Sequence, residues 1–83
     1  MEYPKNCKKK ENRLERVFEF DNFVQAVDFV NEIVPLAEEQ GHHPDLEIFS
    51  YKKVRVNLTT HDEGNKITDK DINLAKKIEK ITL

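Results

Sequence analysis

The sequence is poor in residues that define several common classes of protein. It has a single cysteine, Cys7, so no disulfide can form within the chain. No apolar run approaches the ~20 residues that a membrane-spanning helix needs. The start of the chain also lacks the charged segment, apolar stretch and small-residue cleavage site of a secretory signal. We therefore expect a cytoplasmic protein that has no membrane partner.

The chain also lacks an excess of either charge, which argues against nucleic acid as a partner. Its 14 basic and 16 acidic residues leave a net charge of −2, whereas non-specific nucleic-acid binding needs a basic surface. The basic residues are concentrated near the start, with six Lys or Arg against three Glu in residues 1–16. We expect residues 1–13, which include Lys8-Lys9-Lys10, to form a basic and flexible arm.

The length of the chain limits its architecture. With 83 residues, the sequence predicts one domain over residues 1–83. A chain of this size buries on the order of 60% of its unfolded surface and is marginally stable as a monomer. Self-association would therefore add stability.

Hydrophobic periodicity predicts a strand followed by a long helix. Residues 14–20 alternate between an apolar and a more polar side, as in a strand. Asp21 is placed to cap the helix that follows. Apolar residues then recur at helical spacings, at Phe23, Val27, Val30, Val34 and Ala37. A second apolar set widens this face beyond what one small sheet covers, so we expect the helix to contact a partner as well. This second set is Ala26, Phe29, Ile33 and Leu36.

Gly41 and Pro44 determine the conformation of the segment after the helix. Glycine adopts positive φ readily just past a helix end, so the helix should stop within the two residues before Gly41. Proline disfavours the α region for its predecessor and favours an extended His43. The adjacent residues His42 and His43 therefore lie in a stiff connection between the helix and the next strand.

The next two segments predict an antiparallel hairpin that brings the histidines together. Residues 46–49 and 53–59 alternate in polarity and are separated by a tight connection at residues 50–52. Counting by twos along the second strand places His61 on its polar face, at the far end. In a hairpin this end lies beside the start of the first strand, near His42 and His43. The register thus predicts one site that contains all three histidines of the chain.

A second helix completes the predicted fold. Leu74, Ile78 and Ile81 follow one another at spacings of four and three, as on one helix face. Thr68 and Asp71 have the spacing of a capping box, which is a sufficient structural explanation for Asp71. We predict an α+β fold in which an antiparallel sheet of three to four strands carries two main helices packed on one face.

A histidine cluster suits more than one kind of chemistry. An unperturbed pKa of about 6.5 suits imidazole to acid/base catalysis, and imidazole is also a common zinc ligand. Neighbouring side chains of an extended segment point to opposite faces, which makes it awkward for His42 and His43 to bind one ion. No CxxC, HxxxH or HExxH spacing is present, and Cys7 is remote from the histidines in sequence. We therefore expect neither a metal site nor a cysteine nucleophile.

The spacing of these residues resembles the signature of the pterin-4a-carbinolamine dehydratases. The motif reads Glu38-x3-His42-His43-Pro44, followed by Tyr51, His61 and Asp71. The neighbouring segments Thr59-Thr60-His61 and Asp71-Ile72-Asn73-Leu74-Ala75 are also similar. The resemblance covers roughly residues 14–80, which is most of the predicted domain.

The resemblance implies an enzyme, a hydro-lyase that converts 4a-hydroxytetrahydropterin to quinonoid dihydropterin and water. It implies that no metal or organic cofactor takes part. In this reaction a general acid protonates the 4a-oxygen while a base accepts the N5 proton. We assign His42 and His61 as the proton-donating pair at the 4a-hydroxyl, and His43 as the residue that orients the substrate and as a candidate for the base.

The resemblance also implies supporting residues and partners. Asp71 would orient a histidine, and Glu38 or main-chain groups near Pro44 would hold the amide-like edge of the pterin. Members of the family form homodimers and homotetramers, and animal members also act as dimerisation partners of a transcription factor. The alternative function is therefore a non-catalytic module of the same fold that binds a pterin or another protein.

Two positions depart from the family pattern. Many members carry Asn or Asp just before the histidine pair and an aromatic residue two positions after the proline. This chain has Gly41 and Leu46 there. The lack of a polar side chain at Gly41 would alter the tuning of the His42 pKa. The lack of an aromatic side chain at Leu46 would loosen the pterin pocket.

Overall fold

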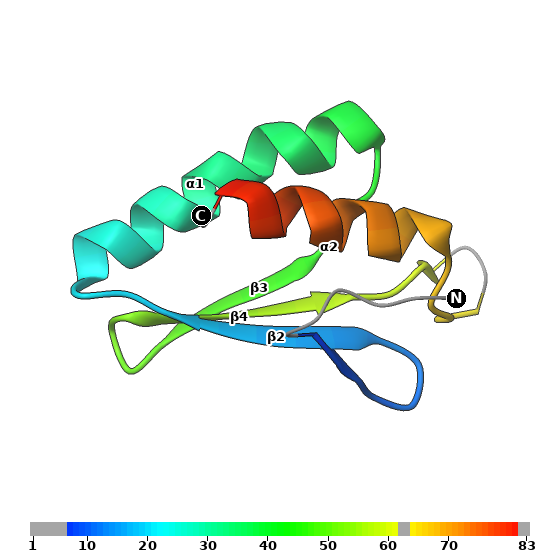
Figure 1. The fold of residues 1–83 in the computed structure, drawn as a ribbon, viewed down its shortest axis with the longest axis horizontal. Helices are drawn as coiled ribbons and strands as arrows, with labels where there is room; N and C mark the ends of the chain where they lie inside the picture. Colours follow the sequence, from blue (N-terminus) through cyan, green and yellow to red (C-terminus); the bar gives the residue numbers. More distant parts are fainter. Residues whose placement is uncertain (1–6, 62–63, 82–83) are drawn as a thin grey trace.

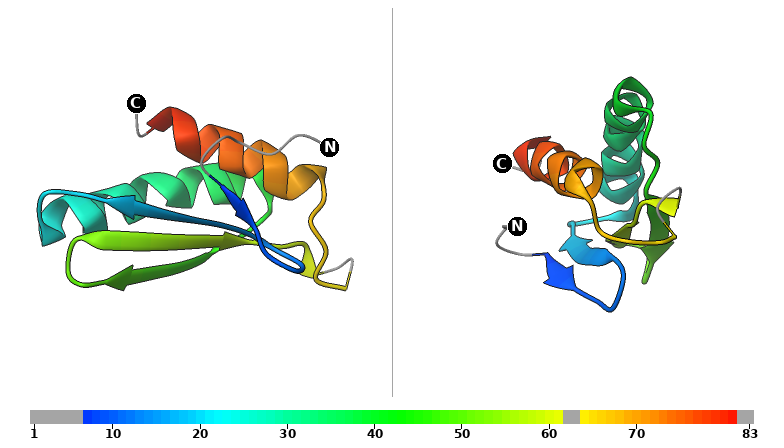
Figure 2. Two further views of the ribbon diagram at one scale, coloured as in Figure 1. Left: turned by 60° about the horizontal axis from the view of Figure 1, so that its bottom comes forward. Right: turned by 90° about the vertical axis from the view of Figure 1, so that its right-hand side faces the viewer.

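Two helices cover one face of a four-stranded antiparallel sheet in the computed structural model, as Figures 1 and 2 show. The structure describes residues 7–61 and 64–81. Its elements are β1 (Lys8–Lys9), β2 (Leu14–Glu19), α1 (Phe23–Gln40), β3 (Asp45–Phe49), β4 (Lys53–Leu58) and α2 (Asp69–Ile81). This architecture confirms the predicted fold class. None of the described helices is long and apolar enough to cross a membrane.

The strands are arranged in the order β1-β2-β4-β3, so β2 and β4 form the centre of the sheet. Leu14 pairs with Leu58, and Phe18 pairs with Val54, which places these four buried side chains on the helix-covered face. Phe29 of α1 packs its ring 4.7 Å from that of Phe18, between centroids. The core thus lies between the two central strands and the two helices.

Strand β1 corrects part of the prediction for the start of the chain. Lys8 and Lys9, expected in a flexible arm, pair with Glu15 and Leu14 of β2. Their side chains are exposed, and backbone pairing with β2 forms the strand. Two exposed lysines show no alternation of apolar and polar residues, so the sequence pattern did not predict this strand. Residues 1–6 of the expected arm lie outside the described residues.

The start of α1 also differs from the prediction. Asn22, and not Asp21, is the N-cap, and its side chain accepts a hydrogen bond of 2.9 Å from the backbone N–H of Gln25. Asn22 has an extended backbone with φ −156°, which is the conformation an N-cap requires. The backbone N–H of Asp21 instead donates to Oε1 of Gln25, at 3.0 Å.

The core-facing side of α1 is the second of its two predicted apolar sets. Ala26, Phe29 and Ile33 are buried together with Ala37, which the periodicity had grouped with the other set. Within that other set, Phe23 and Val34 are 54% and 50% exposed, whereas Val30 is partly buried and packs against the core. The periodicity alone does not decide which set faces the sheet, and the structure shows that the sheet lies under the side of α1 that carries the second set.

The connection from α1 to the hairpin has the predicted form. Gly41 ends the helix with φ +64°, and the backbone N–H of His42 donates to the carbonyl of Ala37 at 3.1 Å. Strands β3 and β4 then pair antiparallel, with Asp45 opposite Asn57. The helix end, β3 and the segment after β4 consequently meet at one end of the molecule (Figure 1).

Candidate active site

The three histidines lie around one surface depression, as the hairpin register predicts. Gly41, His42 and His43 reach it from the end of α1, and Thr60 and His61 reach it from the segment after β4. Lys70, in the first turn of α2, completes the lining. Residues from three distant parts of the sequence are thus brought together.

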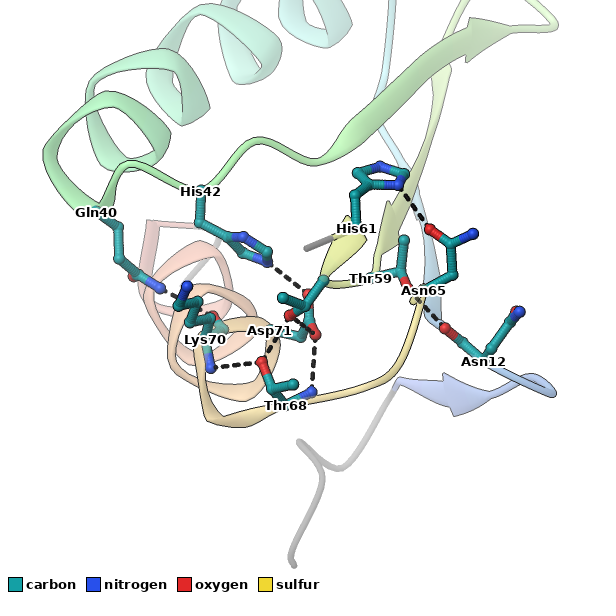
Figure 3. A network of polar contacts seen from close by, with 10 residues as sticks. Asn12, Gln40, His42, Thr59, His61, Asn65, Thr68, Lys70 and Asp71 are labelled. Carbon is teal, nitrogen blue, oxygen red and sulfur yellow. Dashed lines mark hydrogen bonds and ion pairs between the residues drawn. The ribbon is translucent and has the colours of Figure 1, made fainter. Parts of the chain in front are cut away.

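His42 is buried and is held by a buried carboxylate. Its Nε2 lies 2.6 Å from Oδ1 of Asp71, and the two residues are 8% and 0% exposed. Oδ2 of Asp71 accepts a hydrogen bond from Thr60 Oγ1 at 2.8 Å and another from the backbone N–H of Thr68 at 2.9 Å. Both carboxylate oxygens are therefore satisfied, as a buried charged group requires. Figure 3 shows the three contacts converging on Asp71.

Asp71 makes two contacts that bear on the expectations for it. Its bond to the N–H of Thr68 is the capping-box contact predicted at the start of α2. The same carboxylate reaches His42 with its other oxygen. Because a carboxylate accepts a hydrogen bond from a proton-bearing nitrogen, it favours the ring tautomer that carries its proton on Nε2 and leaves Nδ1 unprotonated in the neutral ring. Nδ1 of His42 has no partner among the described residues.

His61 is held by a different kind of group. Its Nδ1 lies 2.7 Å from Oδ1 of Asn65, and both residues are exposed. Figure 3 shows Asn65 and Asp71 contacting their histidines from separate parts of the site. The two histidines are therefore anchored through opposite ring nitrogens, since His42 is held at Nε2 and His61 at Nδ1.

His43, like His61, is exposed. Its Nε2 lies 2.5 Å from Oε2 of Glu38, and the side chains are 65% and 66% exposed. An ion pair this open to solvent is screened and contributes little to stability. Glu38 thus contacts the site through His43 without lining the depression itself.

Pro44 and Leu46 lie beyond the residues that line the depression. Pro44 is half-buried between the histidine pair and β3. Leu46 packs against the hydrophobic core, where it lies opposite Val56 of β4. The absence of an aromatic side chain at Leu46 therefore affects core packing at this edge of the sheet and not the lining of the depression.

Sequence reasoning did not identify the polar residues that support the histidines. Asn65 contacts His61, and Thr60 contacts the Asp71 that holds His42. Lys70 lines the depression, and its carbonyl accepts a hydrogen bond of 2.8 Å from Nε2 of Gln40, which joins the two helices. The one usable signal was the position of Thr60 beside His61 in the motif. The described residues contain no group of three or more His, Cys, Asp or Glu side chains placed to hold a metal ion.

The fold and the site together define a small α+β protein in which three histidines line one surface depression, and comparisons with known proteins give its family. The sequence profile described as pterin 4 alpha carbinolamine dehydratase matches residues 4–81. The chain belongs to this family.

Individual relatives agree with the family match. A protein of Picosynechococcus sp., provisionally named a pterin-4-alpha-carbinolamine dehydratase, is 57% identical over 67 residues, which are 81% of this chain and 71% of the relative. A protein of Sulfolobus acidocaldarius with the same provisional name is 50% identical over 70 residues, 84% of this chain and 75% of the relative.

Solved structures have the same fold. The crystal structure of a transcriptional coactivator/pterin dehydratase from Brucella melitensis matches with a TM-score of 0.84 and 33% identity, over 93% of this chain and 82% of that one. A pterin dehydratase-like protein described as a RuBisCO assembly factor in the alpha-carboxysome matches with a TM-score of 0.67 and 22% identity, over 87% of this chain and 81% of that one. The second match concerns the fold alone.

Proposed function

We propose that the protein dehydrates 4a-hydroxytetrahydropterin to quinonoid dihydropterin and water, in the depression that the three histidines line. The observation that carries the proposal is the convergence of His42, His43 and His61 on this one surface. Family membership supplies the substrate class. The reaction breaks the C4a–O bond, removes the N5 proton and forms the C4a=N5 double bond.

The chemistry needs a proton donor and a proton acceptor on one substrate. Hydroxide is a poor leaving group, so a protonated imidazole must deliver a proton to the 4a-oxygen as the bond breaks. We assign this role to His42 and His61, whose anchored nitrogens leave Nδ1 and Nε2, respectively, for the substrate. His43, at the exposed rim, orients the pterin and accepts the N5 proton.

Supporting roles follow from the contacts of the histidines. Asp71 keeps the His42 ring in place through Nε2. Glu38 lies beside His43, where its carboxylate can accept hydrogen bonds from the donor edge of a pterin, and main-chain groups near Pro44 supply complementary contacts. No step in this scheme is assigned to a metal or an organic cofactor.

The decisive experiment follows the absorbance of 4a-hydroxytetrahydropterin after addition of the purified protein, with and without a chelator. We expect faster loss of the absorbance in both conditions. His42→Ala and His61→Ala should each lower kcat by roughly 100-fold, the contribution of one general acid. Lys76→Ala, an exposed change on α2, should leave kcat unchanged. Wild-type protein that gives no acceleration, even in excess, would rule out the dehydratase proposal.

A non-catalytic protein-interaction module is the second candidate function, because α1 exposes apolar side chains. Phe23, Val24 and Val34 are 54%, 66% and 50% exposed. The same histidine variants separate the two functions. A module of this kind would retain its partner and its cellular role with both His42 and His61 replaced, whereas a dehydratase would lose its activity.

A further inference from the structure

His61 differs from the other two histidines because a neutral group holds it. Nδ1 of His61 lies 2.7 Å from the amide oxygen of Asn65, whereas carboxylates hold His42 and His43. An amide oxygen can only accept a hydrogen bond, so the Nδ1 that faces it must carry the proton. The contact therefore selects one tautomer of the neutral ring and leaves Nε2 unprotonated in that tautomer.

The backbone around Asn65 holds its side chain in position. Asn65 has φ +60°, in the left-handed region, and its N–H donates to the carbonyl of Thr60 at 3.1 Å. A bridge between Thr60 and Lys66 continues this pairing, with Thr60 N–H to Lys66 carbonyl at 2.9 Å. Thr60 is 2% exposed and its hydroxyl bonds to Asp71. The loop is thus anchored on a buried residue that also contacts the His42 partner.

The local backbone alone does not account for asparagine at this position. A left-handed conformation is most easily adopted by glycine, and asparagine adopts it at a small cost. The Asn65 side chain is exposed, where a single hydrogen bond adds little net stability. What asparagine supplies and glycine lacks is an acceptor aimed at Nδ1 of His61.

We propose that Asn65 is a positioning residue for His61. Asn65 fixes the orientation of the His61 ring and its Nδ1–H tautomer, so that Nε2 of His61 exchanges the proton with the substrate. In the protonated ring both nitrogens carry protons, Nδ1–H donates to Asn65 and Nε2–H faces the reacting oxygen. Transfer of the Nε2 proton to the departing hydroxyl leaves the neutral Nδ1–H tautomer, which Asn65 already holds. This inference rests on the proposed dehydratase function for its catalytic part only.

The structural part is tested by nitrogen NMR of the full chain with ¹⁵N-labelled histidine, above the pH at which the rings titrate. Wild-type His61 should show the Nδ1–H tautomer. Asn65→Gly keeps the left-handed backbone but removes the acceptor, so the His61 signals should shift towards the Nε2–H tautomer. Asn65→Asp retains an oxygen acceptor and should retain the wild-type tautomer. The signals of His42 should not change in either variant.

The catalytic part is tested by steady-state kinetics with 4a-hydroxytetrahydropterin. Asn65→Gly should lower kcat roughly 10-fold with little change in KM. A 10-fold loss is at the lower end of the range expected when a histidine loses the hydrogen-bond partner that orients it. Asn65→Asp should restore most of the loss. Lys66→Ala, which alters the next exposed side chain in the loop, is the matched control and should keep the wild-type kcat.

The outcomes for Asn65 and for the dehydratase function can be told apart. An unchanged His61 tautomer in Asn65→Gly overturns the role of Asn65, whatever the activity of the protein. A shifted tautomer with unchanged kcat in an active protein overturns its catalytic part. An inactive wild type that nevertheless shows the Nδ1–H tautomer, lost in Asn65→Gly, supports the positioning of His61 and rejects the dehydratase function.

Discussion

Oδ1 of Asp71 lies 2.6 Å from Nε2 of His42, and Oδ2 of the same carboxylate accepts a hydrogen bond from the backbone N–H of Thr68, the residue just before α2. One buried side chain thus joins a helix cap to a histidine of the candidate site. The two contacts use different oxygens, so neither competes with the other. Substitutions at Asp71 can accordingly separate its structural role from its part in the chemistry.

Asp71→Asn should impair catalysis more than it impairs folding. The amide keeps an oxygen for Thr60 and Thr68 but presents an N–H to Nε2 of His42, which reverses the tautomer of that ring. We expect kcat to fall roughly 100-fold and the free energy of unfolding to fall by about 1–3 kcal/mol. Pterin kinetics and urea unfolding measure the two effects.

The matched control for this change is Asp69→Asn, which replaces an exposed carboxylate in the same turn of α2. It should leave kcat unchanged. If Asp71→Asn lowered stability but retained the wild-type kcat, Asp71 would be a cap alone.

Gly41→Asn should preserve the end of α1. A Cβ built at Gly41 meets no atom within 4 Å, and the φ of +64° is a conformation that asparagine tolerates. We expect a change in unfolding free energy within about 1 kcal/mol, measured by urea titration. Gly41→Val should cost more, because a β-branched residue is strained at positive φ. Equal stability of the two variants would contradict this account of the helix end.

Phe23→Asp should weaken self-association without unfolding the chain. Phe23 is 54% exposed in the first turn of α1, where a negative charge is compatible with the helix dipole. We expect the wild type to form a homodimer or homotetramer through the exposed face of α1, and the variant to shift towards monomer in sedimentation velocity. Asn73→Asp on α2, also exposed, is the control. An unchanged distribution in Phe23→Asp would place the interface elsewhere.

The thiol of Cys7 should react slowly in the native protein. Burial raises its pKa, and the nearby Arg16 guanidinium offsets this only in part. The folded state therefore favours the neutral thiol over the thiolate. The resulting contribution to the free energy of unfolding is fully present below the pKa of Cys7 in the unfolded chain, and it is lost as the pH rises through the higher pKa in the folded chain. Alkylation at mildly alkaline pH should be slower in native than in urea-unfolded protein. Equal rates would show that the thiol is accessible.

The proximity of the histidines was predictable because it depends on strand register. Side-chain alternation along β4 and a tight turn suffice to bring His61 back to His42, and the structure has both. The end of α1 at Gly41 followed from local backbone preference in the same way. Features set by short-range geometry were thus accessible from the residues alone.

Features that depend on tertiary placement were not accessible. Two apolar sets compete on α1, and only the position of the sheet decides that Ile33 is buried while Val34 is half exposed. Strand β1 forms from lysines that carry no apolar pattern. The contact between Asn65 and His61 depends on how the loop folds back on Thr60, which residue spacing does not encode.

The shared carboxylate of Asp71 also links the site to local motions of the chain. Fraying of the first turn of α2 breaks the bond to the Thr68 N–H and displaces the group that holds His42. Opening of this turn and loss of the aligned imidazole are then one event. The hydrogen-exchange rate of the Thr68 amide should therefore report how often an unliganded molecule loses its organised site.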